Sequence, residues 1–194
     1  MKNILAKVSN WRFILPLFVL TLIFPVFLFP SFQDRMTKSA GEEIIPLDSR
    51  FSYSYDEVRS AFDKLGVEGR SAYRLVIARV DNFFALFYGP LFILILAWLL
   101  KKLTGNDSSW VFLALFPLIG ILFEYLENFN TLALLDSYPA ISEERVSWGS
   151  QMTGLKQIFL MASVLLMPVL GLMLLVKNFK RRKNAKVTDS STLI

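Results

Sequence analysis

The sequence predicts an all-α integral membrane protein, a four-helix bundle with a short helical extracytoplasmic segment between its first two spans. Of the 194 residues, 54% are hydrophobic, and most of these are gathered in four apolar stretches. Each stretch has about 20 residues, the length that an α-helix needs to cross a hydrocarbon core of ~30 Å. The stretches do not alternate in polarity as barrel strands do, and backbone groups in lipid need internal hydrogen bonds. Helices are therefore expected.

We expect the four spans at residues 13–32, 83–100, 110–130 and 157–176. A single membrane domain, residues 1–194, then consists of these spans, the outside segments 33–82 and 132–155, and a cytoplasmic tail, 177–194. Three basic residues precede the first span, as in a signal peptide. However, this apolar stretch has the length of a full span and lacks an A-x-A cleavage site, so we expect it to be retained as a signal anchor.

The distribution of charge predicts how the spans are oriented. The two termini and the connection between the second and third spans carry eleven of the 21 Lys and Arg residues. The same segments carry only two of the 16 acidic residues, Asp107 and Asp189. Because Lys and Arg are enriched in cytoplasmic segments, both termini are expected in the cytoplasm. The expected location is a bacterial inner membrane.

The outside segment after the first span is expected to be partly helical. Residues 33–50 have no hydrophobic period and contain glycine and proline, which predicts irregular structure. Ser54 and Glu57 then form a capping-box pattern at the start of an amphipathic helix. Gly66 stands where a left-handed residue would end that helix. A second helix, beginning near Gly69, is expected to continue into the second span.

The end of the third span, LFEYLENFNT at residues 122–131, places acidic and amide side chains in an apolar stretch. Glu124, Glu127 and Asn128 share one helical face because they are three or four residues apart. Glu124 follows Trp110 by fourteen residues, or about 21 Å of helix, which places it in the outer half of the hydrocarbon. A charge in the membrane costs up to about 2.5–3.5 kcal/mol, so this face is expected to point into the bundle.

Neighbouring spans are expected to supply polar partners at the same depth. Asp81 begins the second span, Tyr88 lies two turns further on the same face, and Lys156 begins the fourth span. We therefore predict a polar pocket in the outer leaflet with these ligand-binding residues: Asp81, Tyr88, Glu124, Glu127, Asn128 and Lys156. The alternative is a structural brace, in which Lys156 pairs with one carboxylate, Tyr88 or Asn128 satisfies the other, and the cluster only holds the helices together. Such interhelical polar contacts contribute about 0.6 kcal/mol each.

Three classes of function are compatible with this pocket. The first is binding of a small molecule or lipid in a transport-accessory or sensing role. The second is a membrane enzyme acting on a lipid-like substrate, with Glu124 or Glu127 as the catalytic acid or base. The third is a structural or assembly subunit with a protein partner in the membrane. Of these three classes, binding is the preferred expectation.

Composition limits the cofactors and partners that we expect. The chain contains no Cys and no His, which excludes disulfides, thiol chemistry and thiolate or imidazole metal sites. Neither a cofactor nor a metal is expected. Membrane lipids are the expected partners, and nucleic acid is not, because the basic residues lack a groove-reading or aromatic pattern.

Five basic residues are candidates for binding lipid headgroups. Arg70 and Arg74 lie on the outer extension of the second helix. Lys180, Arg181 and Arg182 directly follow the fourth span, where each basic residue near an anionic leaflet contributes about 1 kcal/mol. The more ordinary interpretations are interfacial anchoring for the first two and an orientation signal for the other three. The aromatic residues of the second span are expected to pack against other helices and lipid.

One combination of residues lies between positions 50 and 160: Leu65-Gly66, Gly69-Arg70, Tyr73, Asp81, Tyr88 and Glu127-Asn128. With this combination the chain resembles a set of small, uncharacterised bacterial four-span membrane proteins. The resemblance implies the topology and no activity. Claudin-like proteins and vitamin K epoxide reductase-like enzymes are excluded, because the cysteines that they require are absent.

Overall fold

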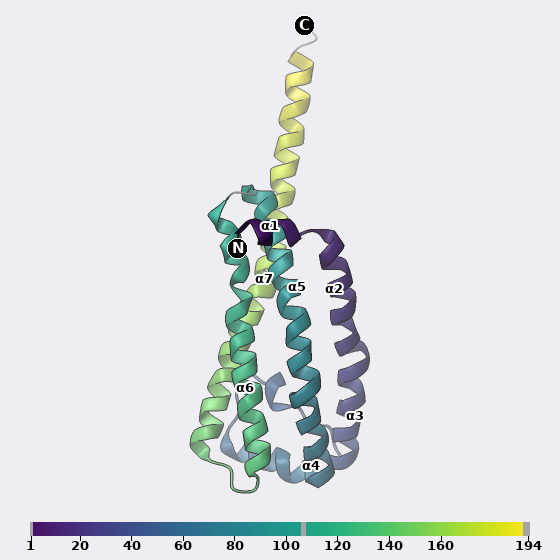
Figure 1. Ribbon diagram of the computed structural model, residues 1–194, viewed down its shortest axis with the longest axis vertical. Helices are drawn as coiled ribbons and strands as arrows, with labels where there is room; N and C mark the ends of the chain where they lie inside the picture. Colours follow the sequence, from purple (N-terminus) through teal and green to yellow (C-terminus); the bar gives the residue numbers. More distant parts are fainter. Residues whose placement is uncertain (1, 106–107, 192–194) are drawn as a thin grey trace.

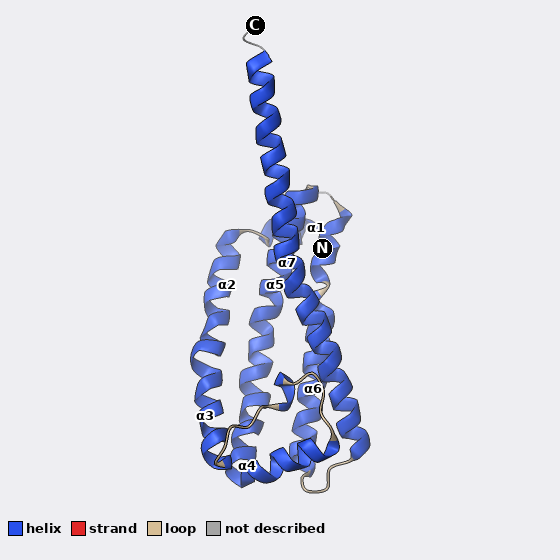
Figure 2. Cartoon of the chain, turned by 180° about the vertical axis from the view of Figure 1, so that it is seen from behind, coloured by secondary structure: helices blue, strands red, loops and turns tan. Residues whose placement is uncertain are grey.

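The computed structural model describes residues 2–105 and 108–191. All regular secondary structure in these two ranges is helical, as the sequence predicts (Figure 2). Four helical segments are long and apolar enough to cross a membrane: Trp11–Ala40, Tyr55–Thr104, Ser109–Ser137 and Glu143–Asn184. They stand side by side in one bundle (Figure 1). The expected fold class, a bundle of four long apolar helices, is therefore confirmed.

Seven α-helices and four shorter helical turns build the bundle in the described residues. The helices are α1 Lys2–Val8, α2 Trp11–Ile23, α3 Phe29–Ala40, α4 Tyr55–Leu75, α5 Asn82–Thr104, α6 Pro117–Ser137 and α7 Glu143–Ser191. The π-helical turns Phe24–Leu28 and Val76–Asp81 join α2 to α3 and α4 to α5. The 3-10 turns are Leu47–Ser49 and Ser109–Leu115.

The two ends of the bundle differ in what covers them. At one end, which we call the cap end, α4 and the loop 41–54 lie across the bundle (Figure 1). At the other end, the tail end, lie α1 and the turn Ser109–Leu115, and α7 projects past them away from the bundle (Figure 1). Both ends of the described chain are thus at the tail end.

The first span is longer than expected, because residues 33–40 are helical and not irregular. They form the last turns of α3, which packs against α4 and ends at Gly41, a glycine with φ of 73°. The side chain of Met36 is buried in this contact. Since these residues show no long apolar period, the partner helix stabilises them as a helix. The irregular segment shrinks to residues 41–54 and contains the turn Leu47–Ser49.

The start of α4 and its bend agree with the sequence. The hydroxyl of Ser54 accepts a hydrogen bond from the backbone N–H of Glu57, and the Glu57 carboxylate accepts one from the Ser54 N–H. Gly66 has the expected positive φ of 59°, but its ψ of −169° is extended and not left-handed helical. The helix therefore bends at Gly66, restarts at once and continues through the π-turn into α5, as expected.

Most of the segment 132–155 is helical, because α6 and α7 extend beyond the predicted third and fourth spans. The last turns of α6 reach Ser137, and α7 begins at Glu143. Only residues 138–142 remain outside helices. As a result, Lys156 lies more than three turns inside α7 and faces the middle of the bundle.

Two apolar cores occupy the two ends. The tail-end core lies between α5, the turn Ser109–Leu115 and α7, and consists of Leu96, Ala97, Leu99, Leu100, Val111, Ala114 and Leu170. The cap-end core joins the loop to α3, α4, α6 and α7, and includes Met36, Leu47, Phe62, Leu65, Tyr73, Ile77, Leu134 and Val146. The polar residues singled out by the sequence lie between these two cores.

Candidate functional site

The polar face of α6 points into the bundle, as its spacing predicts. The side chains of Glu124, Glu127 and Asn128 are all buried. Their position depends on the close approach of α5 and α6, for which Gly89 provides the space: a Cβ atom at this position would overlap the side chain of Ile121. Small residues commonly allow such close contacts between membrane helices.

Lys156 of α7 is the positive centre of the cluster, and its side chain is only 5% exposed. Its Nζ atom lies 2.5 Å from Oε2 of Glu127 and 3.8 Å from Oε1 of Glu124. It also donates a hydrogen bond of 3.0 Å to the backbone carbonyl oxygen of Asp48. The ammonium group thus contacts Glu127 directly, whereas its 3.8 Å distance from Glu124 exceeds the length of a hydrogen bond and makes this contact a longer ion pair.

Glu127 and Asn128 are held by neighbouring helices. Oε1 of Glu127 accepts a hydrogen bond of 2.6 Å from the hydroxyl of Thr153, while Lys156 contacts the other oxygen. The amide nitrogen of Asn128 donates to Oδ1 of Asn82 at 3.1 Å. Neither residue lines the cavity described below. These two contacts fit the brace that the sequence offers as an alternative.

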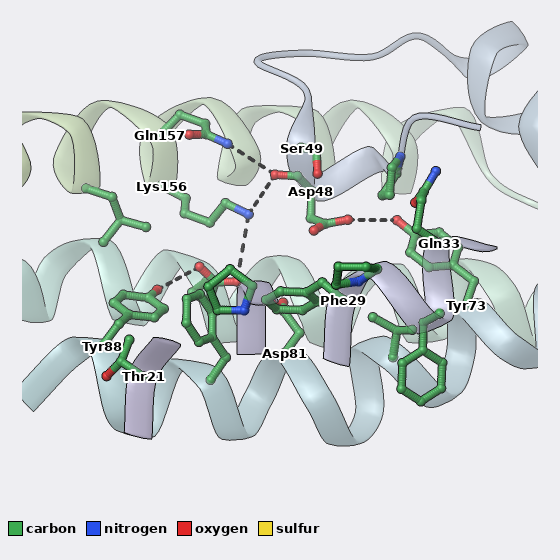
Figure 3. Close-up of a pocket in the computed structure, with 18 of the residues that line it drawn as sticks. Thr21, Phe29, Gln33, Asp48, Ser49, Tyr73, Asp81, Tyr88, Lys156 and Gln157 are labelled. Carbon is green, nitrogen blue, oxygen red and sulfur yellow. Dashed lines mark hydrogen bonds and ion pairs between the residues drawn. The ribbon is translucent and has the colours of Figure 1, made fainter. Parts of the chain in front are cut away.

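Glu124 is placed differently, because it lines a cavity. Its Oε2 atom accepts a hydrogen bond of 2.8 Å from the hydroxyl of Tyr88 (Figure 3). Asp81 also lines the cavity and is only 5% exposed. Its Oδ2 atom has no hydrogen-bond partner within residues 2–105 and 108–191. A buried polar atom without a partner is rare in proteins and calls for a functional or structural explanation.

The loop between α3 and α4 supplies a residue that the sequence did not single out, Asp48. Its backbone carbonyl oxygen accepts hydrogen bonds from Lys156 and from Gln157, the latter at 3.1 Å, and both side chains point toward the turn Leu47–Ser49 (Figure 3). The hydroxyl of Tyr73 donates to Oδ1 of Asp48 at 3.1 Å. Burial raises the pKa of the Asp48 carboxyl, and nearby Lys156 opposes this shift.

The cavity has a volume of ≈ 940 Å³ and runs between α2 and α3 on one side and α7 on the other. Its polar part is lined by side chains from the loop, α3, α5, α6 and α7, namely Gln33, Asp48, Asp81, Tyr88, Glu124, Lys156 and Gln157. Its apolar part is lined by Pro25, Phe29, Phe84, Phe92, Leu160, Met161 and Val164. One continuous space is thus lined by both charged and apolar side chains.

Some aromatic residues of α5 form a wall of this cavity instead of facing lipid. Phe84, Tyr88 and Phe92 are four residues apart and therefore share one helical face. The ring centroids of Phe84 and Tyr88 are 4.9 Å apart, and those of Tyr88 and Phe92 are 5.5 Å apart. Phe83, on another face, is 56% exposed, as expected for a lipid contact.

The five candidate headgroup residues divide into two groups. Arg70 donates to the carbonyl oxygen of Phe62 at 2.6 Å and lies over the ring of Tyr138. Arg74 forms a bidentate ion pair with Asp136 at 2.8 and 3.1 Å. Both arginines therefore have protein partners at the cap end. The second group is fully exposed on the part of α7 that extends past the bundle, and consists of Lys180, Arg181 and Arg182.

Sequence reasoning found the site's residues on α5, α6 and α7 but not those on the loop. No group of acidic residues in the described chain is arranged to hold a metal ion. The chain matches no protein-family model, and neither a curated protein nor a solved structure matches it. The function must therefore be argued from the cavity and the charged cluster alone.

Proposed function

We propose that the protein binds an amphiphilic molecule from the membrane. One observation carries this proposal: a single cavity joins a buried charged cluster to an apolar, phenylalanine-lined region. Its volume of ≈ 940 Å³ is within the range of known ligand sites. In this arrangement the polar end of the ligand contacts the cluster, and its apolar chain lies against Phe29, Phe92 and Leu160.

The walls of the cavity support entry from the lipid. Thr21 and Pro25, from the first span, lie on one side, and Met161 and Val164, from α7, lie on the other. Seen from behind, α2 and α7 stand apart with α5 between them (Figure 2). Met161 and Val164 are also exposed. Because these wall residues are apolar apart from Thr21, the proposal has the alkyl chain of the ligand enter from the bilayer between the two helices.

The proposal includes the topology expected from charge. Both termini would lie in the cytoplasm of a bacterium, in its inner membrane, and the cap end would face outward. Support comes from the tail end of the bundle, where basic residues of the second and fourth spans meet: the Nζ atom of Lys177 donates to the carbonyl oxygens of Lys102 and Leu103. The cavity would then be in the outer leaflet, with membrane lipids as the partners.

A second candidate function, acid–base catalysis, is favoured by the surroundings of Glu124. This carboxylate lines the cavity, accepts a hydrogen bond from Tyr88, and lies next to a second carboxylic acid, Asp81. Glu127 does not line the cavity, and both its oxygens contact other side chains. If the protein is an enzyme, Glu124 is therefore the acid or base. Turnover would be lost in Glu124→Gln and kept in Glu127→Gln in any folded variant.

The binding proposal can be tested with a fluorescent reporter. None of the four tryptophans lines the cavity, so Phe92→Trp places a new indole in its wall. Protein in lipid nanodiscs is titrated with an amphiphile brominated near its chain end, which quenches nearby indoles. We expect saturable quenching, and a lower affinity when Val164→Phe narrows the apolar part.

The matched control is Phe83→Trp, which places the indole on the same helix but on its exposed face. Quenching there should rise with the amount of probe in the lipid and should not saturate. If quenching of both reporters rises with the amount of probe without saturating, no binding site for the probe exists in the cavity. A structural or assembly role, tested by copurification of a membrane partner, would then be preferred.

A further inference from the structure

We infer that the polar end of the cavity recognises an ammonium group, so that the bound amphiphile is an alkylamine or an amine-headed lipid. This inference rests on the proposed binding function and adds the chemistry of the ligand's head. Four observations support it: the charge of the lining residues, the pairing of Lys156 with protein oxygens, the missing partner of Asp81 and the aromatic wall.

The lining residues carry an excess of carboxylates. Four acidic side chains line the cavity, and a single cation, Lys156, lies among its described lining residues. The acids are Asp34, Asp48, Asp81 and Glu124. Asp81 and Glu124 are buried, whereas Asp34 is exposed and Asp48 is partly exposed. The two buried carboxylates, away from bulk water, attract a positive group and repel phosphate or carboxylate.

Lys156 does not offer a site for an anion. Its Nζ atom is in direct contact with Glu127, donates to the carbonyl oxygen of Asp48, and forms a longer ion pair with Glu124. A phosphate head would have to break these contacts and leave a carboxylate buried without a counter-charge, which is costly. The one cation of the cluster therefore serves to hold the protein together.

Asp81 marks the place where the ammonium group would bind. It lines the cavity, it is 95% buried, and Oδ2 has no hydrogen-bond partner in the described chain. Glu124, by contrast, already accepts from Tyr88. An ammonium group between Asp81 and Glu124 would supply the missing donor and neutralise part of the negative charge.

The aromatic wall suits the same ligand. Phe84 and Tyr88 line the cavity beside the carboxylates, with ring centroids 4.9 Å apart. The face of an aromatic ring attracts a cation, and carboxylates combined with aromatic faces are a common environment for ammonium groups. Further along the same face of α5, Phe92 continues the wall toward the apolar part, where the chain would lie.

Three bromoalkyl probes of equal chain length test this inference in the Phe92→Trp protein: an ammonium, an alcohol and a carboxylate. We expect the ammonium probe to bind at least tenfold more tightly than the alcohol, and the carboxylate probe most weakly. Asp81→Asn should reduce the affinity for the ammonium probe about tenfold and leave the affinity for the alcohol unchanged. Glu124→Gln, which retains a hydrogen bond to Tyr88, provides a second variant with the same expectation.

The control variant is Glu42→Gln, which removes an exposed carboxylate at the cap end that pairs with Lys64. It changes the net charge by the same amount and should leave all three affinities unchanged. If the alcohol or the carboxylate probe binds as tightly as the ammonium probe, the inference fails while the binding function stands. If no probe gives saturable quenching, the binding function itself fails.

Discussion

The bundle can be divided into a cap-side half, from the cap end to the charged cluster and its cavity, and a tail-side half, from there to the tail end. The two halves hold their helices together by different means. In the tail-side half, α5, α7 and the turn Ser109–Leu115 meet through aliphatic residues such as Leu96, Leu100 and Val111. In the cap-side half, the described chain has all four of its buried charged residues: Asp81, Glu124, Glu127 and Lys156. One half is an apolar contact, and the other surrounds a cavity with a charged cluster.

This difference separates a half that depends on packing alone from a half that combines charge pairing with a cavity. Helix contacts in lipid gain little from the hydrophobic effect, so the tail-side half depends on close packing. The cap-side half contains groups whose burial is costly unless each is paired. Lys156 and Glu127 satisfy that requirement as a pair, whereas Asp81 does not. Loss of one pairing partner should therefore damage the fold most.

Lys156→Met is expected to have the largest effect on stability. It leaves Glu124 and Glu127 buried without a counter-charge, which should lower the free energy of unfolding by about 3–5 kcal/mol. Thermal unfolding in detergent, followed by intrinsic tryptophan fluorescence, measures the loss. The double variant Lys156→Met/Glu127→Gln removes one of the stranded charges and should recover part of the stability. A single variant as stable as the original protein would show that the pair does not hold the cap-side half together.

Leu96→Ala tests the packing of the tail-side half. Leu96 is fully buried in the tail-end core. Because the alternative environment of a membrane helix is lipid, mainly the packing contribution is lost, so we expect a destabilisation of about 2 kcal/mol. The same variant should leave the affinity for the ammonium probe unchanged. A weaker affinity of Leu96→Ala for the ammonium probe would show that packing in the tail-side half affects the cavity in the cap-side half.

The pH dependence of stability tests the part of the cluster that the loop contributes. Because burial raises the pKa of Asp48, the folded protein retains this proton to higher pH than the unfolded chain. The stabilising contribution of the protonated Asp48 carboxyl is thus present in full at low pH and is lost as the pH rises through its folded-state pKa. Melting temperatures between pH 4 and 8 should fall less steeply in Asp48→Asn. If the melting temperature of Asp48→Asn depended on pH as steeply as that of the original protein, Asp48 would titrate as it does in water.

Local spacing is why much of the cap-side cluster could be predicted. The three polar residues of α6 follow the period of a helix, and the cost of burying charge indicates which way they point. The capping box of Ser54 and Glu57 and the bend at Gly66 depend on neighbouring residues alone, so they too follow from the sequence.

Contacts between distant segments could not be predicted in this way. Asp48 reaches the cluster because Tyr73, Lys156 and Gln157 hold its turn, and these partners lie 25 to 109 positions away in the chain. Residues 33–40 lack a helical period, and their helix depends on packing against α4. The aromatic residues of α5 presented the same difficulty, because composition alone does not distinguish a cavity wall from a lipid-facing surface.

The smallest effect is expected at an exposed ion pair of the cap end, that of Arg74 and Asp136. It has better geometry than the pair of Lys156 and Glu127, since two hydrogen bonds of 2.8 and 3.1 Å join the guanidinium to the carboxylate. Both side chains are about half exposed, however, and water and salt screen exposed pairs. The melting temperature of Arg74→Gln should therefore match that of the original protein at 0.15 M salt. A loss comparable to that of Lys156→Met would mean that charge pairing alone, and not burial, distinguishes the cap-side half from the tail-side half.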